Sequence, residues 1–196
     1  MKTKLADIAE IQMGYPFRTA VKPVKGGTLA VVQMKDVDES AGLIPEACLR
    51  IEDEPGRYEK HLLQVGDVLL QSRGSKFPSV VFDKPLHAVA ALGLIVVRPG
   101  RQVLPAYLSW LLNQTRVREA LRAVAQGTYI PFLSKSEVQA LAISLPPLET
   151  QHRVVHVETL RRRERALQAE LLKLTDLYTD ALVWKTITSN PRKNLS

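Results

Sequence analysis

Several features that would point to a secreted or membrane protein are scarce in these 196 residues. The single cysteine, Cys48, rules out an internal disulfide and a cysteine-based zinc cluster, and it fits a reducing compartment. We expect it to be a small packing residue. The first residues lack the apolar core of a signal peptide, and the longest apolar stretch, Ala88 to Val97, is about half of a membrane span. These absences predict a cytoplasmic protein that does not enter a membrane.

Motifs for catalysis or cofactor binding are also missing. The sequence has no phosphate-binding loop and no glycine-rich dinucleotide turn. The run Leu145-Pro146-Pro147-Leu148 lacks the polar and aromatic members of an amino-methyltransferase motif. His152 and His156 are spaced like two metal ligands on a helix, but no third ligand lies nearby, so we read them as solvated residues. We therefore expect no catalytic residue, no metal and no cofactor, which leaves a small autonomous nuclease or methyltransferase as the weakest hypothesis.

The charge balance is basic. Lysine and arginine outnumber aspartate and glutamate by 27 to 20, giving a net charge of +7 and a pI near 9.6. Such a balance fits a polyanionic partner such as nucleic acid, but it is also common in ordinary soluble proteins. Aromatic residues make up only 6% of the chain, so the composition indicates no broad surface for stacking on bases.

The first hundred residues read as short strands separated by polar loops. Alternating or continuous apolar residues predict strands over 9–13, 29–34, 68–70, 80–82 and 92–97, with the Gly66-Asp67 turn leading into the third. Their irregular spacing predicts a mixed, largely antiparallel sheet.

Helices are predicted after Leu104. Pro105 suits a first helical position, and a second helix is expected over 117–125. Ser134 and Glu137 form a capping box, so a third helix should start at Lys135. A brief strand over 142–145 then precedes a Pro-Pro pair and a long helix. The fold class is α+β, with a globular domain over 1–146, a long coiled-coil helix over 147–186 and a disordered tail over 187–196.

The long helix carries a heptad pattern. With Val157 at position a, seven of the eight a and d positions are apolar or aromatic, and the eighth is Glu164. A helix lying along its own domain would usually show a wider apolar stripe, and arginines 161–163 and 165 would pack poorly against a core. We therefore predict pairing with another helix through the following residues: Val157, Leu160, Leu167, Leu171, Leu174 and Tyr178.

Polar loops supply the candidate binding residues. Gln71, Ser72, Arg73 and Lys76 lie in a glycine-containing loop after a strand, and these side chains suit hydrogen bonds to base edges and phosphates. Tyr129, between two helices, and Arg18, in a second basic region, are further candidates for DNA contact. The alternatives stay open at this point, because an ordinary surface loop and a packed tyrosine would leave the same pattern.

The order of these segments resembles one half of the specificity subunit of type I restriction-modification enzymes. The resemblance rests on residues 5–11 with 14–17, on residues 66–70 with Arg73-Gly74, and on the block from Gly127 through Gln151 followed by the long helix. The resemblance covers nearly the whole chain.

The resemblance implies a target-recognition domain that reads one half of a split DNA site, and a helix that separates two such domains. Double-stranded DNA, a methyltransferase subunit and a restriction or translocase subunit would then be partners, and catalysis would belong to those subunits. Full-length members carry two units and this chain has room for one, so we expect a homodimer on a symmetric bipartite site. The competing hypothesis is an interaction or decoy module that pairs through its helix without binding DNA itself.

Overall fold

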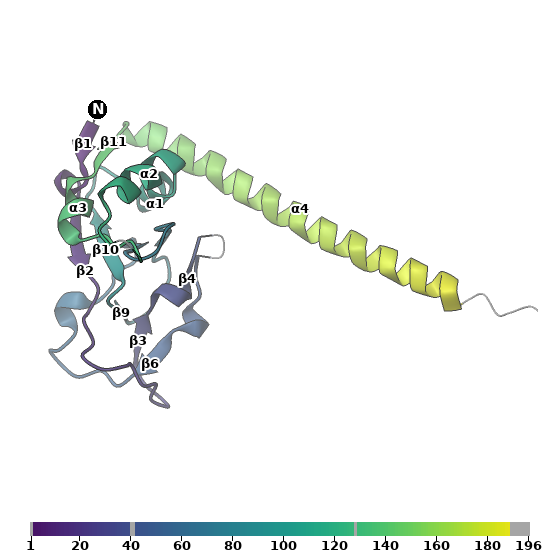
Figure 1. Ribbon diagram of the computed structural model, residues 1–196, viewed down its shortest axis with the longest axis horizontal. Helices are drawn as coiled ribbons and strands as arrows, with labels where there is room; N and C mark the ends of the chain where they lie inside the picture. Colours follow the sequence, from purple (N-terminus) through teal and green to yellow (C-terminus); the bar gives the residue numbers. More distant parts are fainter. Residues whose placement is uncertain (1, 40–41, 128, 189–196) are drawn as a thin grey trace, which may run out of the picture. The chain divides into compact units, whose positions relative to one another are not determined.

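The computed structural model describes residues 2–39, 42–127 and 129–188, arranged as two compact units over 1–155 and 156–196 (Figure 1). Of the tail expected to be disordered, residues 189–196 lie outside the described residues, whereas 187 and 188 are helical.

The described residues form short strands followed by helices. The strands are β1 (Lys2–Lys4), β2 (Ala9–Met13), β3 (Leu29–Val32), β4 (Val37–Asp38), β5 (Gly42–Leu43), β6 (Leu49–Ile51), β7 (Val68–Gln71), β8 (Ser79–Val81), β9 (Ala88–Ala90), β10 (Leu94–Pro99) and β11 (Ala142–Ser144). The helices are α1 (Pro105–Leu112), α2 (Thr115–Val124), α3 (Lys135–Ala140) and α4 (Leu148–Thr188), with short 3-10 turns at Leu5–Asp7, Met34–Asp36, Pro45–Ala47 and Glu59–His61.

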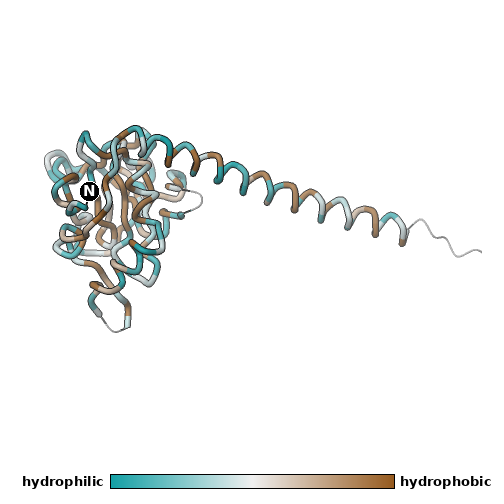
Figure 2. The backbone as a smooth tube through the Cα atoms, turned by 90° about the horizontal axis from the view of Figure 1, so that it is seen from above, coloured by the Kyte–Doolittle hydropathy of each residue, from teal (hydrophilic) through white to brown (hydrophobic). Residues whose placement is uncertain are grey.

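A four-stranded antiparallel sheet in the order β2-β10-β7-β8 forms the centre of the first unit. Successive residues of a strand point to opposite faces, and here both faces are covered. Ile95 and Val97 of β10 belong to a core with α1, α2 and α3, whereas Leu94 and Val96 belong to a second core on the other face. This burial on both sides explains the continuous apolar run of β10. Figure 2 shows that apolar stretches, drawn in brown, lie within the unit.

The smaller sheets complete the mixed topology. Strands β6, β3 and β9 form a three-stranded sheet in which β3 and β9 run parallel, while β1 pairs with β11 and β4 with β5, both antiparallel. The predicted α+β class with a largely antiparallel arrangement is thereby confirmed. The β1–β11 pair brings the start of the chain beside the segment that precedes α4.

Some predicted boundaries were wrong for local reasons. β3 ends at Val32 rather than at Met34, because Met34 begins a 3-10 turn in which Asp36 accepts a hydrogen bond from the Gln33 amide at 2.9 Å. β10 begins two residues late because Gly93 has a φ of +110°. Strands β1, β4, β5, β6 and β9 were not predicted, and α2 starts at residue 115 instead of 117.

The helix starts follow the expected chemistry. Pro105 occupies the first turn of α1, and the Ser134–Glu137 capping box forms at the start of α3. In that box the Glu137 carboxylate accepts from the Ser134 amide at 2.6 Å. Although burial opposes ionisation, hydrogen bonds from Ser134 and Gln126 hold the pKa of Glu137 below its usual value. Cys48 is buried as predicted, and burial raises the pKa of its thiol to about 11, so it stays protonated near neutral pH.

Gln151 fixes the first turns of α4 within the first unit. Its side chain is fully buried and accepts a hydrogen bond from the Leu104 amide at 2.9 Å. Its amide nitrogen donates to the carbonyls of Gln102 at 3.0 Å and Pro146 at 2.9 Å. One side chain thus satisfies three backbone groups, at the start of α1 and in the segment leading into α4.

We predict that Gln151→Ala lowers the free energy of unfolding by about 2–3 kcal/mol, because it leaves several buried backbone groups without partners. Chemical denaturation followed by the fluorescence of Trp110, which packs against the core, would measure this change. A Trp184→Phe background removes the other tryptophan, which is exposed on α4.

Gln168→Ala is the matched control. Gln168 lies on the same helix, is exposed, and bonds only weakly to Glu164 at 3.4 Å, so we expect a change below about 0.5 kcal/mol. Equal effects of the two substitutions would contradict an anchoring role for Gln151.

Candidate nucleic-acid interface

Two loops that lie about 55 residues apart in the sequence are joined by backbone hydrogen bonds. The 72–76 loop follows β7, and the 126–132 loop connects α2 to α3. The Gly74 amide donates to the Pro131 carbonyl at 2.9 Å, and the Leu133 amide donates to the Ser72 carbonyl at 2.8 Å. Arg73 and Phe132 form an antiparallel bridge between them. The pairing turns two separate loops into one surface.

Buried side chains hold both loops at their ends. Phe77 and Leu133, which follow the two loops, belong to the same core and are 0% and 2% exposed. Phe77 has a φ of +44°, a strained conformation for a bulky residue that persists only where its surroundings impose it. Gly74 has a φ of +101°, a conformation that glycine adopts without strain. The 72–76 loop is therefore held in one path.

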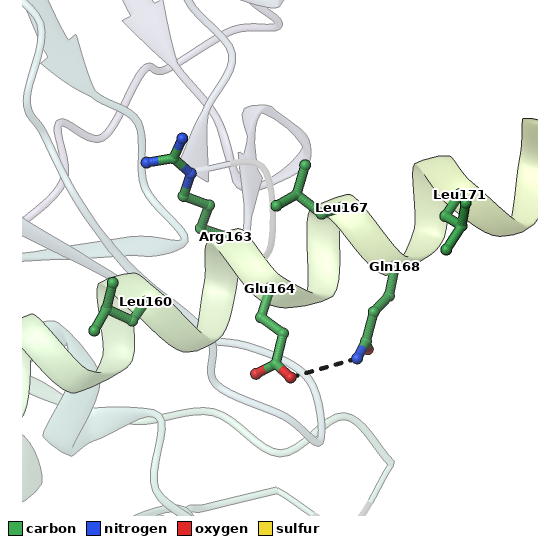
Figure 3. A pocket seen from close by; sticks show the side chains of 6 residues that line it. All are labelled: Leu160, Arg163, Glu164, Leu167, Gln168 and Leu171. Carbon is green, nitrogen blue, oxygen red and sulfur yellow. Dashed lines mark hydrogen bonds between the residues drawn. The ribbon is translucent and has the colours of Figure 1, made fainter.

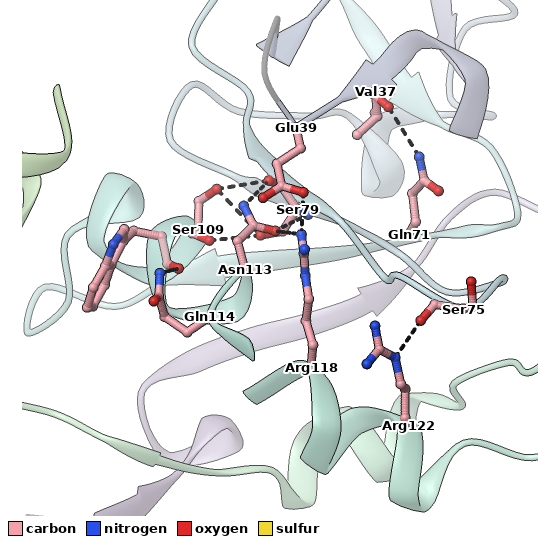
Figure 4. Close-up of polar contacts among 11 residues, drawn as sticks. Val37, Glu39, Gln71, Ser75, Ser79, Ser109, Asn113, Gln114, Arg118 and Arg122 are labelled. Atoms are coloured by element: carbon pink, nitrogen blue, oxygen red, sulfur yellow. Dashed lines mark hydrogen bonds and ion pairs between the residues drawn. The ribbon is translucent and has the colours of Figure 1, made fainter. Parts of the chain in front are cut away.

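A polar network holds strand β8, which follows the 72–76 loop (Figure 4). Asn113 accepts a hydrogen bond from the Ser79 amide at 2.9 Å and donates to the Ser79 carbonyl at 2.8 Å, as a neighbouring strand would. Ser109 and Ser79 also exchange hydroxyl-to-carbonyl bonds at 3.0 and 3.1 Å. Arg118 continues the network to Asn113 and to Glu39. These contacts fix β8, and with it the end of the loop, against α1 and α2.

The predicted DNA-contacting residues divide into two groups. Arg73, Lys76 and Tyr129 are exposed on the paired loops. Gln71 instead donates to the carbonyls of Met34 at 2.8 Å and Val37 at 3.2 Å, and Ser72 is only 3% exposed. In this structure the Gln71 amide is bonded to the protein backbone and the Ser72 side chain is buried.

Arg18 lies in a different part of the unit. It is exposed in the connection between β2 and β3, next to Phe17, whose ring packs with Tyr15 and Tyr58. That aromatic group belongs to the core around β3 and β9, not to the core that holds the paired loops. The structure thus does not bring Arg18 together with Arg73.

Two exposed residues near the loops were not predicted. The Arg122 guanidinium of α2 donates to the Ser75 carbonyl at 2.6 Å, which places a third positive charge beside Arg73 and Lys76 (Figure 4). Ile130 is 62% exposed, next to Tyr129. No sequence signal could have found Arg122, because its role depends on a contact across 47 residues. Ile130 could have been found from its place between Tyr129 and Pro131 in a connection.

The predicted pairing residues of α4 are all exposed in this single chain, and apolar and polar residues alternate along the helix (Figure 2). Leu160, Leu167 and Leu171 line one shallow depression on the helix surface with Arg163, Glu164 and Gln168 (Figure 3). Glu164, the polar member of the seam, accepts a hydrogen bond from Gln168. The helix therefore presents an uncovered apolar seam with one charged position.

Further apolar residues lie outside the seam in the second half of α4. They are Leu172, Leu177, Leu182, Val183, Trp184 and Ile187, all exposed. The heptad pattern alone did not predict them. Their presence widens the apolar surface beyond what one pair of helices needs.

Among residues 2–39, 42–127 and 129–188, no group of histidine, cysteine, aspartate and glutamate could hold a metal ion. In the same part of the chain, no helix combines the length and apolar character that a bilayer crossing requires.

Solved structures of type I restriction-modification proteins share this fold. The HsdS subunit from Thermoanaerobacter tengcongensis superposes with a TM-score of 0.64 at 22% identity, over 85% of this chain and 38% of its own length. A structure described as the basis of complex assembly and conformational transition of the type I R-M system gives 0.63 at 20%, over 95% and 43%. The S subunit from M. genitalium gives 0.58 at 12% identity, over 97% and 46%.

The chain spans less than half the length of each of these solved proteins. A search of curated protein sequences found no significant match. The model of the type I restriction modification DNA specificity domain matches residues 1–173, which is most of the chain. The described fold and this match agree with the resemblance seen in the sequence, and the chain belongs to the family of type I restriction-modification DNA specificity domains.

Proposed function

We propose that this chain is a non-catalytic DNA-reading unit of a type I restriction-modification system and that it recognises one half of a bipartite site. The observation that carries the proposal is the pairing of the 72–76 and 126–132 loops, which places Arg73, Lys76 and Tyr129 on one surface. Methyl transfer and DNA cleavage then belong to the methyltransferase and restriction subunits with which it assembles.

The chemistry of this surface suits DNA. An arginine can donate two hydrogen bonds to the O6 and N7 atoms of guanine, whereas a lysine more often neutralises phosphate. Arg73 sits beside the backbone bridge to Phe132, so its loop is held in place before DNA arrives. Such preorganisation lowers the entropic cost of binding. Arg18, in the other part of the unit, would extend the contact only along the DNA backbone.

The helix α4 supports assembly as a homodimer. Two copies would give two reading units, in keeping with solved relatives that are more than twice as long. A parallel, in-register pair would bring the two Glu164 carboxylates together in the seam, where like charges are costly. An antiparallel pair separates them, obeys two-fold symmetry, and places the reading units at opposite ends. The apolar residues outside the seam then remain for the methyltransferase subunit.

We predict that Arg73→Ala weakens binding of the preferred DNA by about 1–3 kcal/mol and relaxes preference at one base-pair position. The measurement is selection from a randomised bipartite DNA library, followed by fluorescence anisotropy on the selected site. Both use the full chain together with its methyltransferase subunit.

Two variants distinguish base reading from simple loss of charge. Lys76→Ala should weaken all sequences alike and lower the salt slope by about 1. Arg101→Ala removes an exposed arginine beyond the far end of β10, about 20 Å along the strand from the end that pairs with Gln71, and should change little. Unaltered specificity in Arg73→Ala would remove this residue from the readout.

We predict that the isolated chain is a dimer and that the double substitution Leu167→Asp, Leu174→Asp makes it a monomer, because two charges per helix enter the seam. Light scattering after gel filtration should give about twice the chain mass of 21.9 kDa for the wild type.

Leu172→Asp is the control, since Leu172 is equally exposed on α4 but lies outside the a and d positions. It should remain dimeric. A monomeric wild type, or a seam variant that still dimerises, contradicts the homodimer. A chain that pairs through α4 but binds no DNA even with its methyltransferase subunit would instead support the interaction or decoy module.

A further inference from the structure

The tip of the 126–132 loop exposes large apolar side chains. Tyr129 is 99% exposed, Ile130 62% and Phe132 40%. Exposed large apolar groups gathered at one place usually mark a surface that is covered in a complex. Since these residues are consecutive apart from Pro131, they form a narrow projection rather than a broad patch.

Both ends of this projection are held. The Gln126 and Phe132 backbones exchange two hydrogen bonds at 2.9 and 2.8 Å, which closes the loop at its base. Pro131 has a fixed φ, and its carbonyl accepts a hydrogen bond from the Gly74 amide. The Gln126 side chain bonds to Glu137, which caps α3. Hydrogen bonds therefore fix both ends of the loop that carries Tyr129 and Ile130.

The charges around the projection match a nucleic acid better than an apolar protein surface. Arg73 forms a backbone bridge with Phe132, and Lys76 follows in the same loop. Arg122 donates to the Ser75 carbonyl (Figure 4). The acidic residue bonded to the base of the loop is Glu137. Its carboxylate accepts hydrogen bonds from the Ser134 amide and the Gln126 side chain. An apolar tip flanked by cations is the arrangement with which proteins push side chains between stacked bases while holding the phosphates.

We propose that Tyr129 and Ile130 form a wedge that unstacks a base step of the DNA, with Arg73, Lys76 and Arg122 binding the flanking phosphates and bases. This inference rests on the proposed DNA-reading function and adds how part of the sequence is selected. Pyrimidine–purine steps unstack most easily, so a step that the wedge enters is chosen through its deformability as well as through direct contacts. The half-site then contains such a step beside the position read by Arg73.

The test uses the full chain with its methyltransferase subunit, without methyl donor, on the selected DNA. 2-Aminopurine is placed in turn at positions other than the methylated base, since its fluorescence rises when stacking is lost. Wild type should raise the fluorescence at one step. The double substitution Tyr129→Ala, Ile130→Ala should abolish that rise at saturating protein and weaken binding about 10- to 100-fold. Tyr129→Phe should keep the fluorescence rise and the wild-type affinity, because the ring and not the hydroxyl inserts.

A mismatch at the same step provides a second measurement. It lowers the cost of unstacking, so it should tighten wild-type binding about tenfold and leave the double variant unchanged. If wild type binds its site with no fluorescence rise at any step, the wedge is overturned while the DNA-reading function stands. If the double variant binds DNA normally but no longer co-purifies with the methyltransferase subunit, the projection docks protein and the wedge is likewise overturned. A chain that binds no DNA at all overturns both.

Discussion

The candidate interface depends on the backbone hydrogen bonds from Gly74 to Pro131 and from Leu133 to Ser72. Without them the basic 72–76 loop and the apolar tip of the 126–132 loop would be separate surface features. Backbone bonds suit this task because they do not depend on the identity of the side chains that the loops present. The exposed side chains of the loops can therefore change without disturbing the pairing, provided that Gly74, the buried Phe77 and the buried Leu133 keep the path of the chain.

A second constraint acts at the start of α4. Gln151 accepts from Leu104 and donates to Gln102 and Pro146, so the first turns of the helix are built into the first unit instead of being tethered to it. An apolar residue at this position would leave these backbone groups without partners in a dry site. If α4 pairs with a second copy of the chain, it can set the distance between two reading units only if its first turns are fixed in this way.

The sequence predicted the elements that depend on local patterns and missed those that depend on distant contacts. The capping box at Ser134, the helix start at Pro105 and the long helix α4 were correct because each is encoded within a few residues or in an uninterrupted helical pattern. The same local reasoning placed Gln71 and Ser72 at an exposed loop, since it could not know that Met34 and Val37 would accept the Gln71 amide. Arg122 was missed for the same reason, because its partner Ser75 lies in another element.

Burial and existing hydrogen bonds distinguish residues that support the fold from residues that remain accessible to a ligand. Asp67, in the Gly-Asp motif, is 1% exposed and its carboxylate is occupied by a bidentate pair with Arg98 at 2.8 Å and by the Gln64 amide. The hydrogen bonds that Arg98 donates to Asp67 raise the pKa of Arg98, so its guanidinium stays charged. Such groups have no capacity left for a ligand. The exposed side chains of Arg73, Lys76 and Tyr129 remain accessible, and under the proposed function they are the candidates for contact with DNA.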